Sequence, residues 1–120
     1  MANSSNTGFA RIIKAAGYSW QGVCAAYRNE AAFRQEVWLC SVMIPLGLYL
    51  GDNGVEKALL VSSVILLPLT EILNSAVEAV VDRFGEEQHE LSGRAKDMAS
   101  SAVALSIILM VSVWLLVLIF

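Results

Sequence analysis

The sequence predicts an all-α integral-membrane protein with three transmembrane helices and an N-terminal amphipathic helix at the membrane surface. Two observations indicate this class. Hydrophobic residues make up 57% of the 120 residues and charged residues 16%, which is a membrane composition, and the length fits a single domain, 1–120. Three apolar runs follow a segment with the period of an amphipathic helix, and the last run, 98–120, carries no charge.

The segment 8–28 is predicted to form the surface helix. Its apolar residues recur at steps of three and four: Phe9, Ile12, Ile13, Ala16, Trp20, Val23, Cys24 and Tyr27. Residues 1–35 hold four Lys or Arg against one acid, which suits anionic lipid headgroups or a phosphate-bearing ligand. An ordinary helix packed on a protein core is the alternative.

The three spans are expected at about 31–50, 56–83 and 94–120. The first is short and carries Arg34 and Glu36 near its start, so it is expected to begin in the interface. Pro45 and Pro68 fall within spans, where tolerated kinks are expected. The Lys and Arg count places the N-terminus and the 82–97 loop in the cytoplasm and the C-terminus in the periplasm.

The second span carries two carboxylates and an amide. At about 100° per residue, Glu78 returns to within about 20° of Glu71, roughly 10 Å along the helix, with Asn74 about 60° to one side. Acidic residues in a span cost about 3 kcal/mol each and indicate a functional site. One helix face therefore carries two carboxylates at two depths.

This face supports more than one chemistry. A carboxylate in it could take a proton from a lipid hydroxyl or bind Mg²⁺ over phosphates, and the 82–97 loop is rich in groups able to hold a magnesium nucleotide. Standard nucleotide motifs are absent from the sequence, and a polar loop alone has the same composition. A small proton-coupled multidrug transporter and a structural oligomer held by polar residues remain alternatives. No nucleic-acid partner is expected.

Three segments carry a family resemblance. Glu-Ile-Leu-Asn-Ser-Ala-Val-Glu-Ala-Val-Val-Asp-Arg at 71–83, Glu-Leu-Ser-Gly-Arg-Ala-Lys-Asp at 90–97 and Asn-Glu-Ala-Ala-Phe-Arg-Gln-Glu at 29–36 closely resemble prokaryotic diacylglycerol kinase. Residues 8–20 look like the surface helix of that family. The first and last spans match in character more than in letter.

The resemblance implies a homotrimer of three-span subunits whose active sites are shared between neighbouring subunits. The implied reaction is phosphorylation of diacylglycerol by ATP with Mg²⁺, giving phosphatidic acid at the cytoplasmic leaflet of a bacterial inner membrane. Relatives that act on undecaprenol make an undecaprenol kinase the alternative within the family.

The resemblance also implies roles for residues. Glu71 would be the general base, Glu30 and Glu78 would bind the magnesium, and Asn74 would support the site. The implied nucleotide contacts are Arg11, Tyr18, Glu30, Glu78, Glu87, Gln88, His89, Lys96 and Asp97. The implied lipid contacts are Arg11, Ala15, Ala16, Gly17, Tyr18, Ser19, Trp20, Cys24, Ala25, Ala26, Tyr27, Ala32, Phe33, Arg34, Gln35, Glu36 and Glu71.

Overall fold

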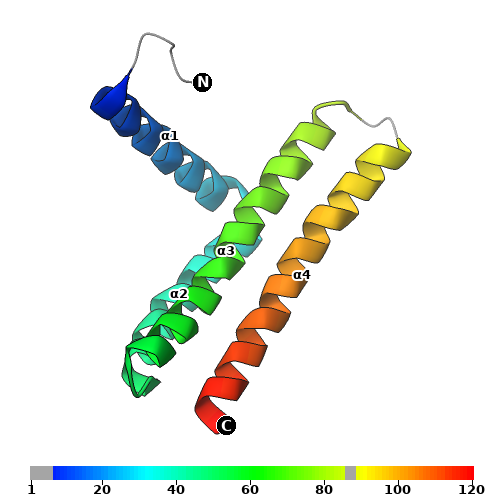
Figure 1. The fold of residues 1–120 in the computed structure, drawn as a ribbon. Helices are drawn as coiled ribbons and strands as arrows, with labels where there is room; N and C mark the ends of the chain where they lie inside the picture. The colour runs from blue at the N-terminus through cyan, green and yellow to red at the C-terminus, as the bar shows by residue number, and fades with distance from the viewer. Residues whose placement is uncertain (1–6, 86–88) are drawn as a thin grey trace.

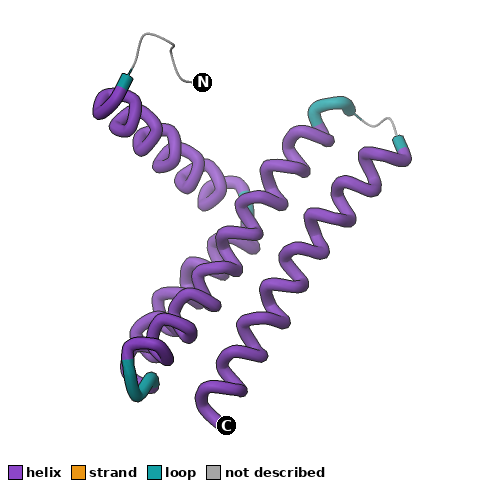
Figure 2. The backbone as a smooth tube through the Cα atoms, viewed as in Figure 1, coloured by secondary structure: helices purple, strands orange, loops and turns teal. Residues whose placement is uncertain are grey.

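The computed structural model describes residues 7–85 and 89–120, and this part of the chain folds into four α-helices without a strand. The helices are α1 (Gly8–Asn29), α2 (Ala31–Leu50), α3 (Gly54–Asp82) and α4 (Glu90–Ile119). Figure 1 gives their order, and Figure 2 shows the short connections from α1 to α2 and from α2 to α3. The all-helical prediction is confirmed.

Helix α3 is the centre of the molecule, because both α2 and α4 pack along it while α1 points away (Figure 1). The core is small: the buried hydrophobic side chains among the described residues are Phe33, Leu60, Val64 and Leu67. Gly47 lets α2 approach closely, since a Cβ placed there would lie 3.1 Å from the Leu60 Cβ. Trp114 of α4 joins the same region by donating its indole N–H to the Leu60 carbonyl at 3.2 Å.

The turn between α2 and α3 is built from the predicted Gly-Asp-Asn-Gly sequence. Asn53 is the N-cap of α3, and its side-chain oxygen accepts the Glu56 backbone N–H at 3.0 Å. The Glu56 carboxylate accepts the Asp52 N–H at 3.0 Å in return. Two backbone donors at the helix start are thereby satisfied, as in a capping box.

Pro68 lies inside α3 without ending the helix. A proline has no N–H, so the Val64 carbonyl one turn earlier loses its partner within the helix. The Cys40 thiol of α2 lies 3.8 Å from that carbonyl and donates to it. A neighbouring helix therefore satisfies the group that the proline leaves free, which is how membrane helices tolerate proline.

Two of the described helices, α3 and α4, are long and apolar enough to cross a membrane, with mean hydropathy 1.7 and 2.9. Helix α2 is not among them, since Arg34, Gln35 and Glu36 make its first turns polar. The count of three spans therefore stays a prediction. Helix α4 leaves large apolar side chains such as Leu105 and Ile108 at least 60% exposed. Such a surface requires lipid or other protein around it.

The helix bounds differ from the predicted ranges mainly at the start of the last two. Helix α3 begins at Gly54 rather than 56, since the Asn53 cap allows an earlier start. Helix α4 begins at Glu90 rather than near 94, because the His89 side chain caps it. Both helices thus extend beyond their most apolar residues.

Candidate functional site

The predicted acidic face lies on α3 and includes a buried carboxylate. Glu71 is only 7% exposed. One turn further on, the Asn74 side-chain amide donates to the Glu78 carboxylate at 3.3 Å. The structure thus brings Asn74 and Glu78 into direct contact, with the buried Glu71 about two turns earlier on the same helix than Glu78.

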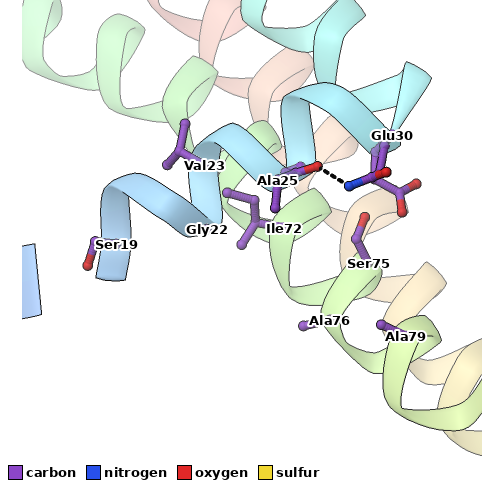
Figure 3. Close-up of a pocket in the computed structure, with 11 residues that line it drawn as sticks. Ser19, Gly22, Val23, Ala25, Glu30, Ile72, Ser75, Ala76 and Ala79 are labelled. Carbon is purple, nitrogen blue, oxygen red and sulfur yellow. Dashed lines mark hydrogen bonds between the residues drawn. The ribbon is translucent and has the colours of Figure 1, made fainter. Parts of the chain in front are cut away.

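Glu30 joins this face from a different part of the chain. It is the extended residue between α1 and α2, with φ −121° and ψ 108°. It lines a groove of about 650 Å³ together with Ser75, Ala76 and Ala79 of α3 and part of α1. Figure 3 shows the Glu30 carboxyl group beside Ser75 at the edge of this groove. Small residues on both helices leave the space open.

The carboxylates of this region interact electrostatically. Glu71 interacts with Glu78 and Glu30. Glu36 of α2 interacts with Glu71 as well. Four acids from three parts of the chain therefore share one region, and such a cluster is stabilised by a cation or by protonation. Sequence reasoning placed Glu36 only as a lipid contact, because nothing in its spacing shows that α2 packs beside Glu71.

Three buried oxygen atoms in this region have no hydrogen-bond partner among the described residues: Glu36 Oε1, Asn74 Oδ1 and Ser75 Oγ. Unpaired buried oxygens are rare and are explained by a water, an ion or a ligand. Ser75 was not predicted as a site residue. Its spacing of four residues from Glu71, about 40° around the helix, is the signal that could have identified it.

The oxygen atoms of this site suit Mg²⁺ bound together with a substrate better than a metal ion coordinated only by protein side chains. No group of three His, Cys, Asp or Glu within residues 7–85 and 89–120 is arranged to hold a metal ion. Mg²⁺ is commonly bound by only one or two carboxylates, with water and substrate phosphates completing its octahedron. Glu30 and Glu78, with the unpaired Asn74 oxygen nearby, offer ligands of this kind.

Within one chain, the structure does not bring together all of the nucleotide contacts predicted for the segment after α3. Lys96 of α4 forms an ion pair with Asp82 at the end of α3, with 3.1 Å between Nζ and Oδ1. His89 caps α4, its Nδ1 accepting the Leu91 N–H at 3.1 Å, and Asp97 is exposed. The predicted contacts Glu87 and Gln88 lie outside the described residues.

The predicted contacts on α1 are separated from those on α4. Arg11 and Tyr18 are exposed on α1, and Figure 1 shows α1 and the start of α4 on opposite sides of α3. A second groove of about 480 Å³ lies at the junction of α1 and α2, and its lining includes the predicted lipid contacts Trp20, Cys24, Tyr27 and Phe33. This groove is mostly apolar and suits a hydrocarbon chain.

These features define an all-helical membrane protein with an acidic site on an apolar helix, beside an amphipathic surface helix. Comparison with known proteins identifies its family. Residues 17–118 match the family described as prokaryotic diacylglycerol kinase. The chain therefore belongs to the prokaryotic diacylglycerol kinase family and is a kinase, which decides against the transporter and the purely structural oligomer.

Individual relatives cover nearly the whole chain. The diacylglycerol kinase of Escherichia coli K12 is 56% identical over 118 residues, covering 98% of this chain and 96% of the relative. The diacylglycerol kinase of Haemophilus influenzae is 48% identical over 108 residues, covering 90% and 92%. The diacylglycerol kinase of Helicobacter pylori J99 is 41% identical over 107 residues, covering 89% and 84%.

Proposed function

We propose that this protein transfers the γ-phosphoryl group of ATP to the free hydroxyl of diacylglycerol, forming phosphatidic acid and ADP. The observation that carries the proposal is the buried Glu71 carboxylate beside Glu78 and Glu30. The choice of diacylglycerol as the acceptor is supported by the relatives, which are named diacylglycerol kinase. Phosphoryl transfer depends on positioning and charge neutralisation, so scattered side chains can suffice without a standard nucleotide motif.

The proposed roles of the carboxylates depend on how far each one lies from the C-terminal end of α3. Glu71 lies eleven residues before Asp82, or about 16 Å from the helix end, and Glu78 lies about 6 Å from it. A lipid hydroxyl arrives from the membrane and a nucleotide from water. Glu71 is therefore proposed as the general base, with Glu30 and Glu78 as magnesium ligands and Asn74 orienting Glu78 through its hydrogen bond.

The proposed step is a single displacement. The lipid hydroxyl oxygen forms a bond to the γ-phosphorus while its proton passes to the Glu71 carboxylate. The bond from that phosphorus to the β,γ-bridging oxygen breaks, and ADP leaves with the electron pair. Magnesium bound with the nucleotide would neutralise charge on the phosphates.

The nucleotide is proposed to contact Arg11 and Tyr18 of α1 as well as Lys96 and Asp97 of α4, with the neighbouring 87–89 stretch. Since α1 and the start of α4 lie on opposite sides of α3 within one chain (Figure 1), a complete set requires a second chain. This supports a homotrimer with shared active sites, three spans in each subunit and the exposed apolar surface of α4 covered by lipid or neighbours. The proposed lipid contacts are Arg11, 15–20, 24–27, 32–36 and Glu71. Those that line the two grooves are Ser19, Trp20, Cys24, Ala25, Ala26, Tyr27 and Phe33, with Ala25, Ala26 and Ser19 in the first groove and the others in the second.

The proposed location is the inner membrane of a bacterium, with the site at the cytoplasmic leaflet. The start of α1 lies at the same end of the molecule as the end of α3 and the start of α4 (Figure 1), so one side of the membrane would hold the nucleotide contacts proposed near the starts of α1 and α4. The excess of Lys and Arg at this end favours the cytoplasmic side and leaves the C-terminus in the periplasm.

The test is a kinase assay in detergent micelles. Purified protein with MgATP and dioleoylglycerol should form phosphatidic acid, and Glu71→Gln should lower kcat at least 100-fold, the lower range expected on losing a general base. Glu90→Gln is the matched control, since Glu90 pairs with Arg94 on the exposed surface of α4. Undecaprenol as a competing acceptor decides between the two lipids. Equal product from wild-type protein and Glu71→Gln would overturn the proposal.

A further inference from the structure

The junction between α1 and α2 consists of one extended residue, Glu30. Because α1 ends there, the carbonyl groups of its last turn have no partner within their own helix. The Glu30 N–H satisfies one of them by donating to the Ala26 carbonyl at 2.9 Å. The carbonyl groups of Tyr27 and Arg28, next along the chain, need another donor.

Arg34 supplies that donor from the first turn of α2. Its Nη1 lies 2.8 Å from the Tyr27 carbonyl oxygen and 3.1 Å from the Arg28 carbonyl oxygen. Its backbone N–H donates to the Glu30 carbonyl at 3.2 Å, at the start of α2. One residue therefore holds both sides of the junction, and Glu30 lies between the two sets of bonds.

The sign of the charge agrees with this role. A positive side chain in the first turn of α2 is unfavourable toward the dipole of α2 itself. At the C-terminus of α1, where the helix carries partial negative charge, the same guanidinium is favourable and forms charge-assisted hydrogen bonds. The position of Arg34 is thus explained by α1 rather than by its own helix.

Helix α1 has little else to hold its direction. It contains no buried residue, and in Figure 1 it leaves the other three helices at the junction. Glu30 nevertheless reaches α3, where it lines the groove beside Ser75 (Figure 3) and interacts electrostatically with Glu71. A change in the angle at the junction would move Glu30 relative to α3.

We propose that Arg34 is a positioning residue that locks α1 onto α2 and thereby holds the Glu30 carboxylate toward Glu71 and Glu78. The consequence for magnesium rests on the proposed function, in which Glu30 is a metal ligand. This role is separate from the lipid contact that the family resemblance implies for Arg34. Loss of the positioning role would change the magnesium requirement, whereas loss of a lipid contact would change the KM for the lipid.

The experiment compares wild-type protein, Arg34→Lys and Arg34→Gln in detergent micelles. Arg34→Lys keeps the charge without the branched guanidinium, and Arg34→Gln keeps a donor without the charge. Lys14→Gln is the control, because it removes a positive charge from the exposed surface of α1 at a residue that lines neither groove and is not a proposed contact. Two quantities are measured: hydrogen exchange of backbone amides in 23–33, and the Mg²⁺ concentration giving half-maximal phosphatidic acid formation.

Both quantities should rise in the order wild type, Arg34→Lys, Arg34→Gln, by about threefold to tenfold in total, as expected for losing charge-assisted hydrogen bonds. The KM for dioleoylglycerol should change less than the magnesium requirement, and Lys14→Gln should match wild type. Unchanged exchange, or a raised lipid KM with an unchanged magnesium requirement, would overturn the proposal. Wild-type protein that forms no product defeats the proposed function instead, and the exchange rates then still decide whether Arg34 holds the junction.

Discussion

The Thr70 hydroxyl of α3 and the Ser106 hydroxyl of α4 lie 3.0 Å apart and form a hydrogen bond between the two helices. Ser106 is only 3% exposed, and Thr70 directly precedes Glu71. Each hydroxyl also lies within hydrogen-bond distance of a carbonyl of its own helix, Leu67 or Val103, so one hydroxyl donates to its own carbonyl while the other donates across to it. This polar contact therefore ties α4 to the turn that carries the proposed base.

The contact between Thr70 and Ser106 should be measurable as a coupling energy. Thr70→Val and Ser106→Ala should each lower the free energy of unfolding, and the pair should show a coupling of about 0.6 kcal/mol, the average for such bonds in membrane proteins. Reversible unfolding in mixed detergent micelles measures it through a double-mutant cycle. Purely additive effects would show that the hydroxyls do not interact.

Pro68 and Cys40 should be coupled through the Val64 carbonyl. Cys40→Ala leaves that carbonyl without a partner and should destabilise the protein by about 1 kcal/mol, whereas Cys40→Ser keeps a donor there. In a Pro68→Ala background the helix regains its own N–H donor at this position. The effect of Cys40→Ala should therefore shrink in that background, which thermal unfolding can test. An equal effect in both backgrounds would contradict this account of the proline.

Gly47 should not tolerate a larger side chain. A Cβ there meets the Leu60 Cβ at 3.1 Å and Trp114 Cζ2 at 3.5 Å, so Gly47→Ala should destabilise by about 1–3 kcal/mol through overpacking. Gly93→Ala is the matched control within α4, where the added Cβ meets no atom of the described part of the chain within 4 Å. That change should be neutral or stabilising by up to about 1 kcal/mol. Similar unfolding midpoints for the two variants would contradict the close approach of α2 and α3.

Asn74 should be needed for activity and not for stability. Its side-chain oxygen is buried without a partner among residues 7–85 and 89–120, although its amide nitrogen bonds Glu78. Asn74→Leu removes this polar group from an apolar helix and should leave stability unchanged or higher, while phosphatidic acid formation falls at least tenfold. Unfolding and kcat are measured on the same preparation. A stability loss as large as the activity loss would indicate that Asn74 acts mainly in folding.

The helices and the acidic face on α3 were predictable because they depend on local properties. Hydropathy over about twenty residues determines which segments favour a membrane, and the fixed rotation per residue in an α-helix aligns Glu71 with Glu78. The extension of α4 back to Glu90, before the predicted span 94–120, depends on the His89 cap, whose side-chain geometry periodicity does not show. The identity of the acceptor lipid rests on similarity to relatives rather than on any pattern of apolar and polar residues.

The sequence by itself thus determined an all-helical chain with membrane-length apolar helices. It also determined that two carboxylates lie on one face of the second predicted span, which is α3. Only the tertiary structure decided that Glu30 and Glu36 join those carboxylates, that Arg34 holds the end of α1, and that Cys40 completes the helix at Pro68. The physical reason is the distance along the chain over which each kind of interaction acts. Periodicity and hydropathy act within one helix, whereas these contacts depend on the angle and register at which separate helices meet, which side-chain packing sets.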